Sequence, residues 1–227
     1  MKKVVLVLAL TAFIASGAFA QLSFSAGVGA FFDGSFGNGV KMTLGSKWSE
    51  QGNDIISFGG FLFFDASFAE ASVSFGYNSI AAEYKRDSDG NKASEALDPD
   101  EGFLAMGLSF LGKFPLNMGA LTFYPAIGIE YNIVLAHFRG GDKVDYGDES
   151  VTEWFSQFGI LAGVGIDLPL SSAMYLRAQA LFNLRFPNKF VKDYAESYNE
   201  YLSVLSGSAA ATLGIGPKIK VGIGFRL

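Results

Sequence analysis

Hydrophobic and polar positions alternate along most of the chain with a period of two, which marks β-strands that have two different faces. The contrast is sharpest between Ala173 and Phe186, where one face is apolar and the other carries mainly tyrosine, arginine, glutamine and asparagine. Between Phe61 and Phe64 both faces are bulky, so the pattern leaves the inner face of that strand open. The alternation predicts eight strands: Leu22–Phe32, Ile55–Phe64, Glu70–Tyr84, Phe103–Gly112, Ala120–Ala136, Phe155–Leu168, Ala173–Phe186 and Ser208–Leu227.

The connections between these strands alternate in length. Three are short, at Asp65–Ala69, Phe114–Gly119 and Pro169–Ser172. The others are long and polar: Asp33–Asp54, Lys85–Gly102, His137–Trp154 and Pro187–Gly207. Short turns at one end and long loops at the other are typical of a transmembrane antiparallel up-and-down β-barrel. Val40, Met42 and Leu44 also alternate inside the first loop, which leaves a ten-stranded barrel open.

The first residues predict export. Lys2 and Lys3 precede an apolar stretch from Val4 to Ile14, and Ala18-Phe19-Ala20 matches a cleavage site. The apolar stretch is too short for a membrane anchor. We therefore expect a cleaved signal peptide at residues 1–20 and one barrel domain at residues 21–227.

Composition indicates which face of the barrel wall points outward. Half of the residues are hydrophobic and 17% are charged, and no later apolar run approaches the roughly 18 residues of a membrane helix. Any membrane span is therefore a β-strand. An eight-stranded barrel has a narrow interior, which suits the glycine and serine positions better than the bulky apolar ones. A soluble barrel with an apolar interior would also need a highly charged outer face, which is not found.

The C-terminus carries a motif. Lys220-Val221-Gly222-Ile223-Gly224-Phe225-Arg226-Leu227 places a polar residue, a glycine and an aromatic residue at fixed spacing before an apolar end. It resembles the assembly signal of outer-membrane barrels, here carried by Lys220, Gly222, Phe225 and Leu227, with Leu in place of the usual Phe. In size and topology the chain is similar to the small eight-stranded type of OmpX, OmpW and the OmpA membrane domain. The resemblance implies a bacterial outer-membrane location, lipid contact, periplasmic chaperones and insertion by the barrel-assembly machinery.

Charged residues on the polar face are expected to lie in the lumen, where burial without partners would be costly. Asp167 should lie opposite or diagonal to Arg177 across the last short turn. Ion pairs among these residues favour a plugged interior over a narrow ion path. The predicted lumen set is Glu70, Glu130, Asp167, Arg177, Arg185, Lys218, Lys220 and Arg226.

Two loop motifs suggest chemistry only weakly. His137, the single histidine, could form a triad with Ser156 or Glu153, but nothing in the spacing requires one, so we expect no enzyme. Residues of the second loop follow part of a calcium-binding frame, but Gly90 falls at position 4 instead of 6. A solvated acidic loop without metal or other cofactor is the expectation for Asp87, Asp89, Asn91 and Asp98.

The fourth loop repeats large residues at helical spacing: Tyr194, Tyr198, Tyr201, Leu202 and Leu205. They predict either a helix that caps the barrel mouth or an exposed aromatic surface for a partner. Trp48 and Trp154 are expected near the membrane interface. The leading hypothesis is a structural or surface-interaction platform with four extracellular loops, for adhesion or host contact through an extracellular ligand. A narrow channel for small or hydrophobic solutes is the alternative, and the net charge of −5 argues against nucleic acid.

Overall fold

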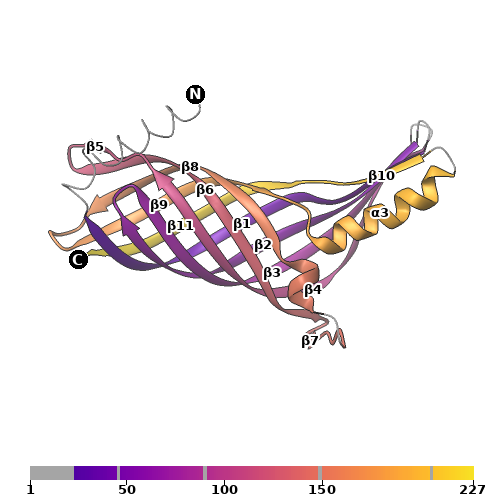
Figure 1. Cartoon of the computed structure of the whole chain (residues 1–227), viewed down its shortest axis with the longest axis horizontal. Coiled ribbons are helices and arrows are strands. Elements are labelled where there is room, and N and C mark those ends of the chain that lie inside the picture. Colours follow the sequence, from indigo (N-terminus) through magenta and orange to yellow (C-terminus); the bar gives the residue numbers. More distant parts are fainter. Residues whose placement is uncertain (1–22, 45–46, 89–90, 148–149, 205–206) are drawn as a thin grey trace, which may run out of the picture.

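The protein forms a closed antiparallel β-barrel of eight long strands (Figure 1). The computed structural model describes residues 23–44, 47–88, 91–147, 150–204 and 207–227. The predicted signal peptide at residues 1–20 therefore lies outside the described residues. The barrel strands are β1 (Phe24–Leu44), β2 (Lys47–Ala66), β3 (Ala69–Ser88), β4 (Asn91–Lys113), β6 (Leu121–Arg139), β8 (Gln157–Pro169), β9 (Met174–Arg185) and β11 (Gly214–Arg226).

Each of these strands pairs with the barrel strands next to it in sequence, which makes the topology up-and-down. Ser25 of β1 lies opposite Asp65 of β2 on one side and Arg226 of β11 on the other, so β1 closes the barrel. The prediction of eight strands is confirmed. Short elements occupy the connections: β5 (Leu116–Met118), β7 (Asp142–Lys143), α2 (Val151–Phe155), α3 (Lys189–Ser203) and β10 (Gly207–Ala211).

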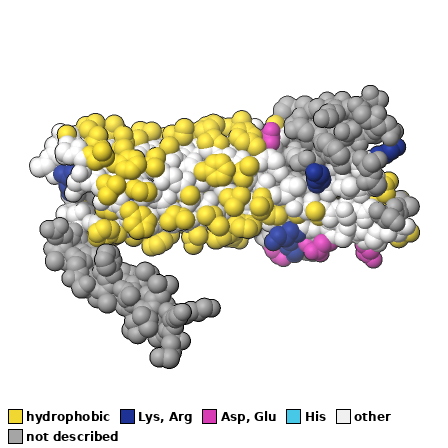
Figure 2. Space-filling view, turned by 90° about the horizontal axis from the view of Figure 1, so that it is seen from above, with side chains coloured by type: hydrophobic (Ala, Val, Ile, Leu, Met, Phe, Trp, Pro, Cys, Tyr) yellow, Lys and Arg dark blue, Asp and Glu magenta, His cyan; other side chains and the backbone are white. Residues whose placement is uncertain are grey.

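The apolar face of the wall points outward. Leu62 is 61% exposed and Phe182 is 53% exposed, and Figure 2 shows hydrophobic side chains covering the wall, with charged side chains gathered mainly beyond one end of it. The same alternation holds in the bulky stretch of β2, whose inner face the sequence pattern left open. Phe61 and Phe63 are buried in the lumen, while Phe64 is 48% exposed. Among the described residues, no helix is long and apolar enough to span a membrane.

Aromatic rings fit into the narrow lumen because glycines lie beside them. A Cβ atom at Gly27 would come within 2.3 Å of the Phe63 ring, and one at Gly29 within 2.5 Å of the Phe61 ring. Gly224 faces Tyr175 in the same way. Gly27, Gly29 and Gly224 therefore have a packing role, since each lacks the side chain that a neighbouring ring would strike.

We expect Gly224→Ala to destabilise the barrel by about 1–3 kcal/mol, the usual cost of overpacking. Its Cβ would lie 2.1–2.5 Å from two ring carbons and the hydroxyl oxygen of Tyr175, a side chain that is itself buried in the lumen. Urea unfolding in lipid vesicles measures the effect. Gly112→Ala is the matched control, because its Cβ would first meet a backbone oxygen at 3.6 Å. Equal stability of the two variants would contradict the packing role.

Two of the predicted loops are wrong. Residues 33–54 and 85–102 are largely continuations of the barrel strands, so β1 with β2 and β3 with β4 form long hairpins beyond the barrel (Figure 1). The alternation of Val40 and Met42 thus belongs to β1 and adds no ninth strand. These extensions lie beyond the apolar belt, so neither face of their strands is turned to lipid. The alternation of apolar and polar residues that marks a membrane strand is therefore weaker there.

A β-bulge changes which side chains of β1 point inward. The register shifts between Ser35 and Asn38, and Gly37 adopts φ 79°, a conformation that favours glycine. Thr212, in the break between β10 and β11, holds the bulge: its hydroxyl donates to the Gly37 carbonyl (2.6 Å) and accepts from the Gly39 amide (2.9 Å). Inward positions are odd before the bulge and even after it, which turns Asn38 and Val40 toward the interior.

Candidate functional site

The turn-side half of the lumen is organised around Arg177 of β9, which is 1% exposed. Its guanidinium donates two bonds to Asp167, at 2.7 and 2.6 Å, and pairs with Glu70 at 2.8 Å and Asp65 at 2.7 Å. Asp167 lies directly opposite it in the register, as predicted. The guanidinium carbon also lies over three rings, those of Phe63 (4.6 Å), Tyr175 (5.1 Å) and Tyr124 (5.6 Å).

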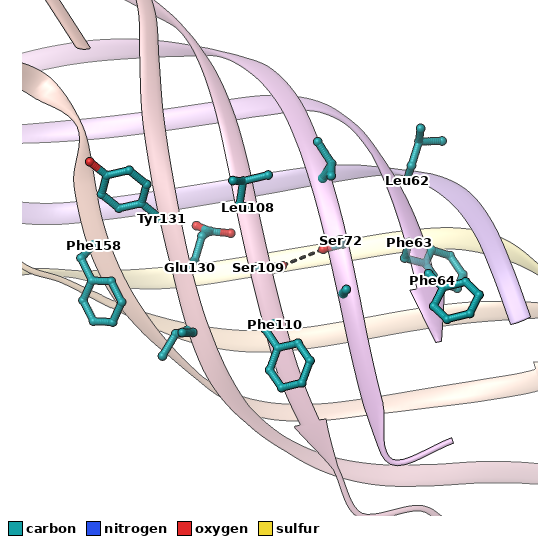
Figure 3. Close-up of a pocket in the computed structure, with 13 residues that line it drawn as sticks. Leu62, Phe63, Phe64, Ser72, Leu108, Ser109, Phe110, Glu130, Tyr131 and Phe158 are labelled. Atoms are coloured by element: carbon teal, nitrogen blue, oxygen red, sulfur yellow. Dashed lines mark hydrogen bonds between the residues drawn. The ribbon is translucent and has the colours of Figure 1, made fainter. Parts of the chain in front are cut away.

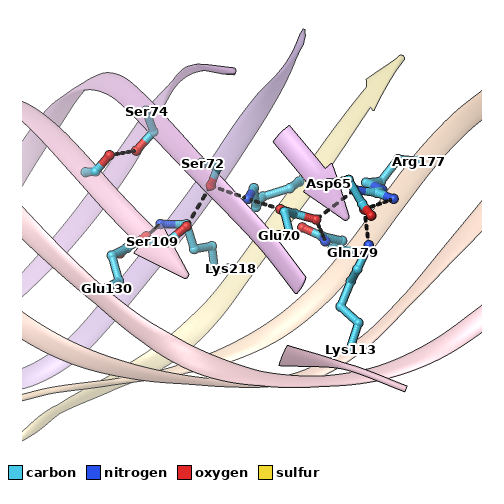
Figure 4. A network of polar contacts seen from close by, with 12 residues as sticks. Asp65, Glu70, Ser72, Ser74, Ser109, Lys113, Glu130, Arg177, Gln179 and Lys218 are labelled. Carbon is cyan, nitrogen blue, oxygen red and sulfur yellow. Dashed lines mark hydrogen bonds and ion pairs between the residues drawn. The ribbon is translucent and has the colours of Figure 1, made fainter. Parts of the chain in front are cut away.

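Two lysines complete this network (Figure 4). The Lys220 ammonium donates to Glu70 and to the Ser72 hydroxyl, both at 3.0 Å, and lies 4.4 Å from the centre of the Phe61 ring. Lys113 pairs with Asp65. Three carboxylates thus meet three cations across six strands, β2, β3, β4, β8, β9 and β11.

A second network lies further toward the loop side. Asp33 accepts from Arg185 at 2.5 Å and pairs with Lys218 at 3.2 Å, and Lys218 also pairs with Glu130. All four side chains are nearly fully buried. This network again balances two carboxylates against two cations. Buried charges of both signs in equal number favour a filled interior, because neither an anion nor a cation is left to attract a permeating ion.

Seven of the eight predicted lumen residues belong to these two networks, and Arg226 does not. Arg226 is exposed at the turn-side rim, where it donates to the Ser172 carbonyl at 3.1 Å. Sequence reasoning missed three lumen charges: Asp33, Asp65 and Lys113. Each was assigned to a turn or loop, or fell at a predicted strand end. Extending the strand alternation by one or two residues would have placed Asp33 and Lys113 on the inner face.

Above the ion pairs, the lumen is closed by apolar side chains. The inward-facing cluster of Ile55, Ile80, Phe103 and Val134 is buried, and Val151 and Phe155 of the short helix α2 pack on it. Thr152 of α2 fixes the helix by donating to the Val134 carbonyl at 2.7 Å. The loop between β6 and β8 thus folds back as a lid over the polar interior.

The longer helix α3 covers the inner side of the β1–β10 extension. Asn188 caps its first turn by accepting a hydrogen bond from the Val191 amide at 2.9 Å, after Pro187 has ended the strand. Val191 and Ala195 are buried against Val40. The helix predicted from the spacing of tyrosines is confirmed, and it covers the loop-side end of the β1–β10 extension while leaving aromatic rings exposed.

A row of aromatic rings starts at Trp154 of α2 and continues along α3. Trp154, Phe190, Tyr194 and Tyr198 follow one another with centroid separations of 6.3, 6.2 and 4.7 Å. Burial and the neighbouring Tyr198 raise the pKa of Tyr194 to about 12, so its hydroxyl stays protonated at neutral pH. Tyr198 is 38% exposed and Tyr201, one turn further, is 69% exposed.

His137 lies under the lid and not in a triad. Its Nδ1 is hydrogen-bonded to the Tyr146 hydroxyl, and its ring packs 4.5 Å from that of Phe103. In the described part of the chain, Ser156 accepts instead from the Val134 amide at 3.2 Å and Glu153 pairs with Lys189 at 2.6 Å.

Of the calcium-frame residues, Asp87 and Asn91 lie at paired positions of the extended β3–β4 hairpin, Asp98 lies on β4 where the register with β3 shifts, and Asp89 lies outside the described residues. Within the described ranges, no group of three or more histidine, aspartate or glutamate side chains is arranged to bind a metal ion. Trp154 lies at the loop-side rim beside α3, whereas the side chain of Trp48 is not among those described.

Two hollows flank the wall. An apolar groove of about 610 Å³ lies on the outer surface over β3, and Leu62, Val73, Leu108, Tyr131 and Phe158 form one cross-strand row along it (Figure 3). A polar hollow of about 410 Å³ opens at the turn side and ends on Arg177. The apolar groove faces the surroundings of the barrel, and the polar hollow ends at the ion-pair network around Arg177.

The residues of the C-terminal motif divide between the two faces of β11. Lys220 is buried in the lumen, and Gly222 leaves room near the Phe61 ring. Phe225 and Leu227 are exposed on the outside, at 45% and 79%. The motif therefore presents an apolar edge outward at the turn-side end of the last strand, and its role as an assembly signal stays a prediction.

Comparisons with known proteins add little to this geometry. No family model and no curated protein matches the chain. Five chains of solved structures match, among them the translocator domain of the autotransporter NalP from Neisseria meningitidis. It is 14% identical, with 96% of this chain and 92% of that chain covered, at a TM-score of 0.26. No conclusion rests on so low a score, and the resemblance to the OmpX, OmpW and OmpA type stays a prediction.

Proposed function

We propose that the protein is a bacterial outer-membrane barrel with a permanently sealed lumen, which serves as a platform for the hairpins and helices at its loop-side end. The observation that carries the proposal is the lumen itself, in which five carboxylates and five cations pair beneath an apolar lid. A channel would need a continuous water-filled path, lined by polar groups that are free to contact the solute. The proposal assigns no catalytic role to His137.

Two further observations support the membrane location. The outward belt of large apolar side chains would be unfavourable in water and favourable in lipid, and the closed sheet leaves no barrel edge unpaired. The predicted export signal and the C-terminal motif are consistent with the outer membrane of a bacterium, reached through periplasmic chaperones and the barrel-assembly machinery. The elements beyond the belt are then extracellular.

Planar-bilayer recording of the refolded mature chain tests the sealed lumen. We expect no sustained conductance, because Arg177, Glu70 and Lys220 occupy the axis together with their partners. Replacing Arg177 and Lys220 by alanine is the positive control for detection, since it removes two of the three cations of the turn-side network. Sustained conductance of the unaltered chain would refute the platform and favour the narrow channel.

A further inference from the structure

The single histidine of the chain joins the lid to the barrel wall. His137 lies at the loop-side end of β6, five residues beyond Asn132, where pairing between β6 and β8 ends. Its side chain is 4% exposed, and its ring packs against Phe103 of β4 and Phe155 of α2, with centroids 4.5 and 5.7 Å away. Its Nδ1 atom is hydrogen-bonded to the Tyr146 hydroxyl, in the segment between β7 and α2. Moving the lid away from the wall would break the contacts of this one imidazole with Tyr146 and Phe155.

The surroundings of the imidazole favour its neutral form. The Nε2 atom lies 3.7 Å from a carboxylate oxygen of Glu101, which is longer than a hydrogen bond. The other oxygen of Glu101 accepts from the Nε atom of Arg139 at 2.6 Å. The neighbouring strands β2 and β3 contribute Ile55 and Ile80 to the cluster that contains Phe103. A proton added to His137 would therefore place a positive charge among apolar side chains, beside a carboxylate that Arg139 already neutralises.

Other charges near the lid do not change this balance. Lys189 at the start of α3 pairs with Glu153 of α2 at 2.6 Å, and both side chains are exposed. The remaining charged side chains in the described part of the lid are also exposed: Asp142, Lys143 and Asp145. Burial therefore decides: it lowers the pKa of His137 below its ordinary value, with Glu101 opposing the effect and Arg139 adding to it.

The direction of the pH response follows from this lowered pKa. An imidazole in water has a pKa of about 6.5, so opening the lid and hydrating His137 would raise its pKa toward that value. The open form therefore binds a proton more tightly than the closed form. The stability of the closed lid is complete above a pH of about 6.5 and is lost as the pH falls below it.

We propose that the lid is an acid-sensitive switch, in which protonation of His137 releases α2 and the Tyr146 segment from the barrel wall. The released form exposes the apolar cluster of Ile55, Ile80, Phe103 and Val134 on the loop side. His137 takes no part in the two ion-pair networks below the lid, so the lumen stays closed to ions. The inference rests on the proposed function, because it takes the lid to be extracellular, and it adds a response of the platform to acid.

The fluorescence of Trp154 in the refolded mature chain, held in zwitterionic nanodiscs, tests the switch. Trp154 lies on α2, and in a Trp48→Phe background it is the single tryptophan. Its ring packs 6.3 Å from that of Phe190, so opening of the lid would hydrate it. From about pH 7.5 to about pH 5 we expect its emission to move to longer wavelength, with a midpoint below about 6.5. His137→Gln keeps hydrogen-bonding groups but takes up no proton, and it should abolish the transition.

Two substitutions next to His137 test the electrostatics in opposite directions. Glu101→Gln removes the attracting carboxylate and should lower the midpoint by about half a pH unit, whereas Arg139→Gln removes the repelling cation and should raise it by a similar amount. Glu200→Gln is the matched control for the first of them. It removes the same charge roughly 15 Å beyond Phe190 along α3, and it should leave the midpoint unchanged.

A transition that persists in His137→Gln, or midpoint shifts of the same sign in the Glu101 and Arg139 variants, would overturn the switch. Planar-bilayer recording at neutral and at acid pH separates this inference from the platform. A lid that does not respond to acid, on a chain without conductance, refutes the switch alone, whereas sustained conductance at either pH refutes the sealed platform.

Discussion

Replacing Arg177 by methionine should lower the free energy of unfolding by about 3–5 kcal/mol, the cost of leaving buried charges without their partner. Asp65, Glu70 and Asp167 all pair with this one guanidinium. Methionine has a similar length but carries no charge, so the loss reflects electrostatics more than volume. Urea unfolding in lipid vesicles measures it.

Arg226→Met is the matched control for that substitution. The side chain is exposed at the turn-side rim and donates to one backbone carbonyl, so we expect a change within about 0.5 kcal/mol. Adding Asp167→Asn to the Arg177 variant should recover part of the loss, because among the described residues Asp167 pairs with Arg177 alone, whereas Glu70 keeps Lys220 and Asp65 keeps Lys113. Equal stability of the two arginine variants would mean that the turn-side network does not hold the barrel together.

Leu108→Arg should destabilise the barrel in lipid by about 2–4 kcal/mol, because Leu108 lies at the middle of the outward belt along β4. Met118→Arg, at the turn-side end of the wall, should cost no more than about 1 kcal/mol. Both side chains are exposed, at 42% and 63%, so burial by the protein does not separate them. Unfolding in vesicles at a series of urea concentrations compares the two, and similar costs would argue against a membrane around the belt.

The wall of the barrel could be predicted from the sequence because lipid and lumen impose opposite demands on alternate residues. That contrast located all eight strands and seven lumen charges. It could not decide the inner face at Phe61–Phe64, because only the glycines on the facing strands, such as Gly27 and Gly29, show where rings fit. Some pairs across the lumen, such as Glu70 with Lys220 and Asp33 with Arg185, join residues about 150 positions apart, which no local pattern records.

The extracellular half was harder to predict for a related reason. Beyond the belt both faces of a strand are wet or packed against other elements, so the period-two contrast that marks a strand disappears. The β1–β2 and β3–β4 hairpins were therefore assigned to loops. Helix α3 was found because its tyrosines keep a helical repeat, whereas the five-residue α2 is too short to leave one.

The lumen ion pairs also bear on how fast the protein unfolds. Glu70 of β3 meets Arg177 and Lys220, which follow it by 107 and 150 residues. We expect contacts of that separation to form only when β11 joins β1, which would place them after the transition state for closing the sheet. Interactions made after the transition state slow unfolding without speeding folding. The network would thus act as a kinetic latch, which lengthens the lifetime of an inserted barrel and leaves its rate of assembly unchanged.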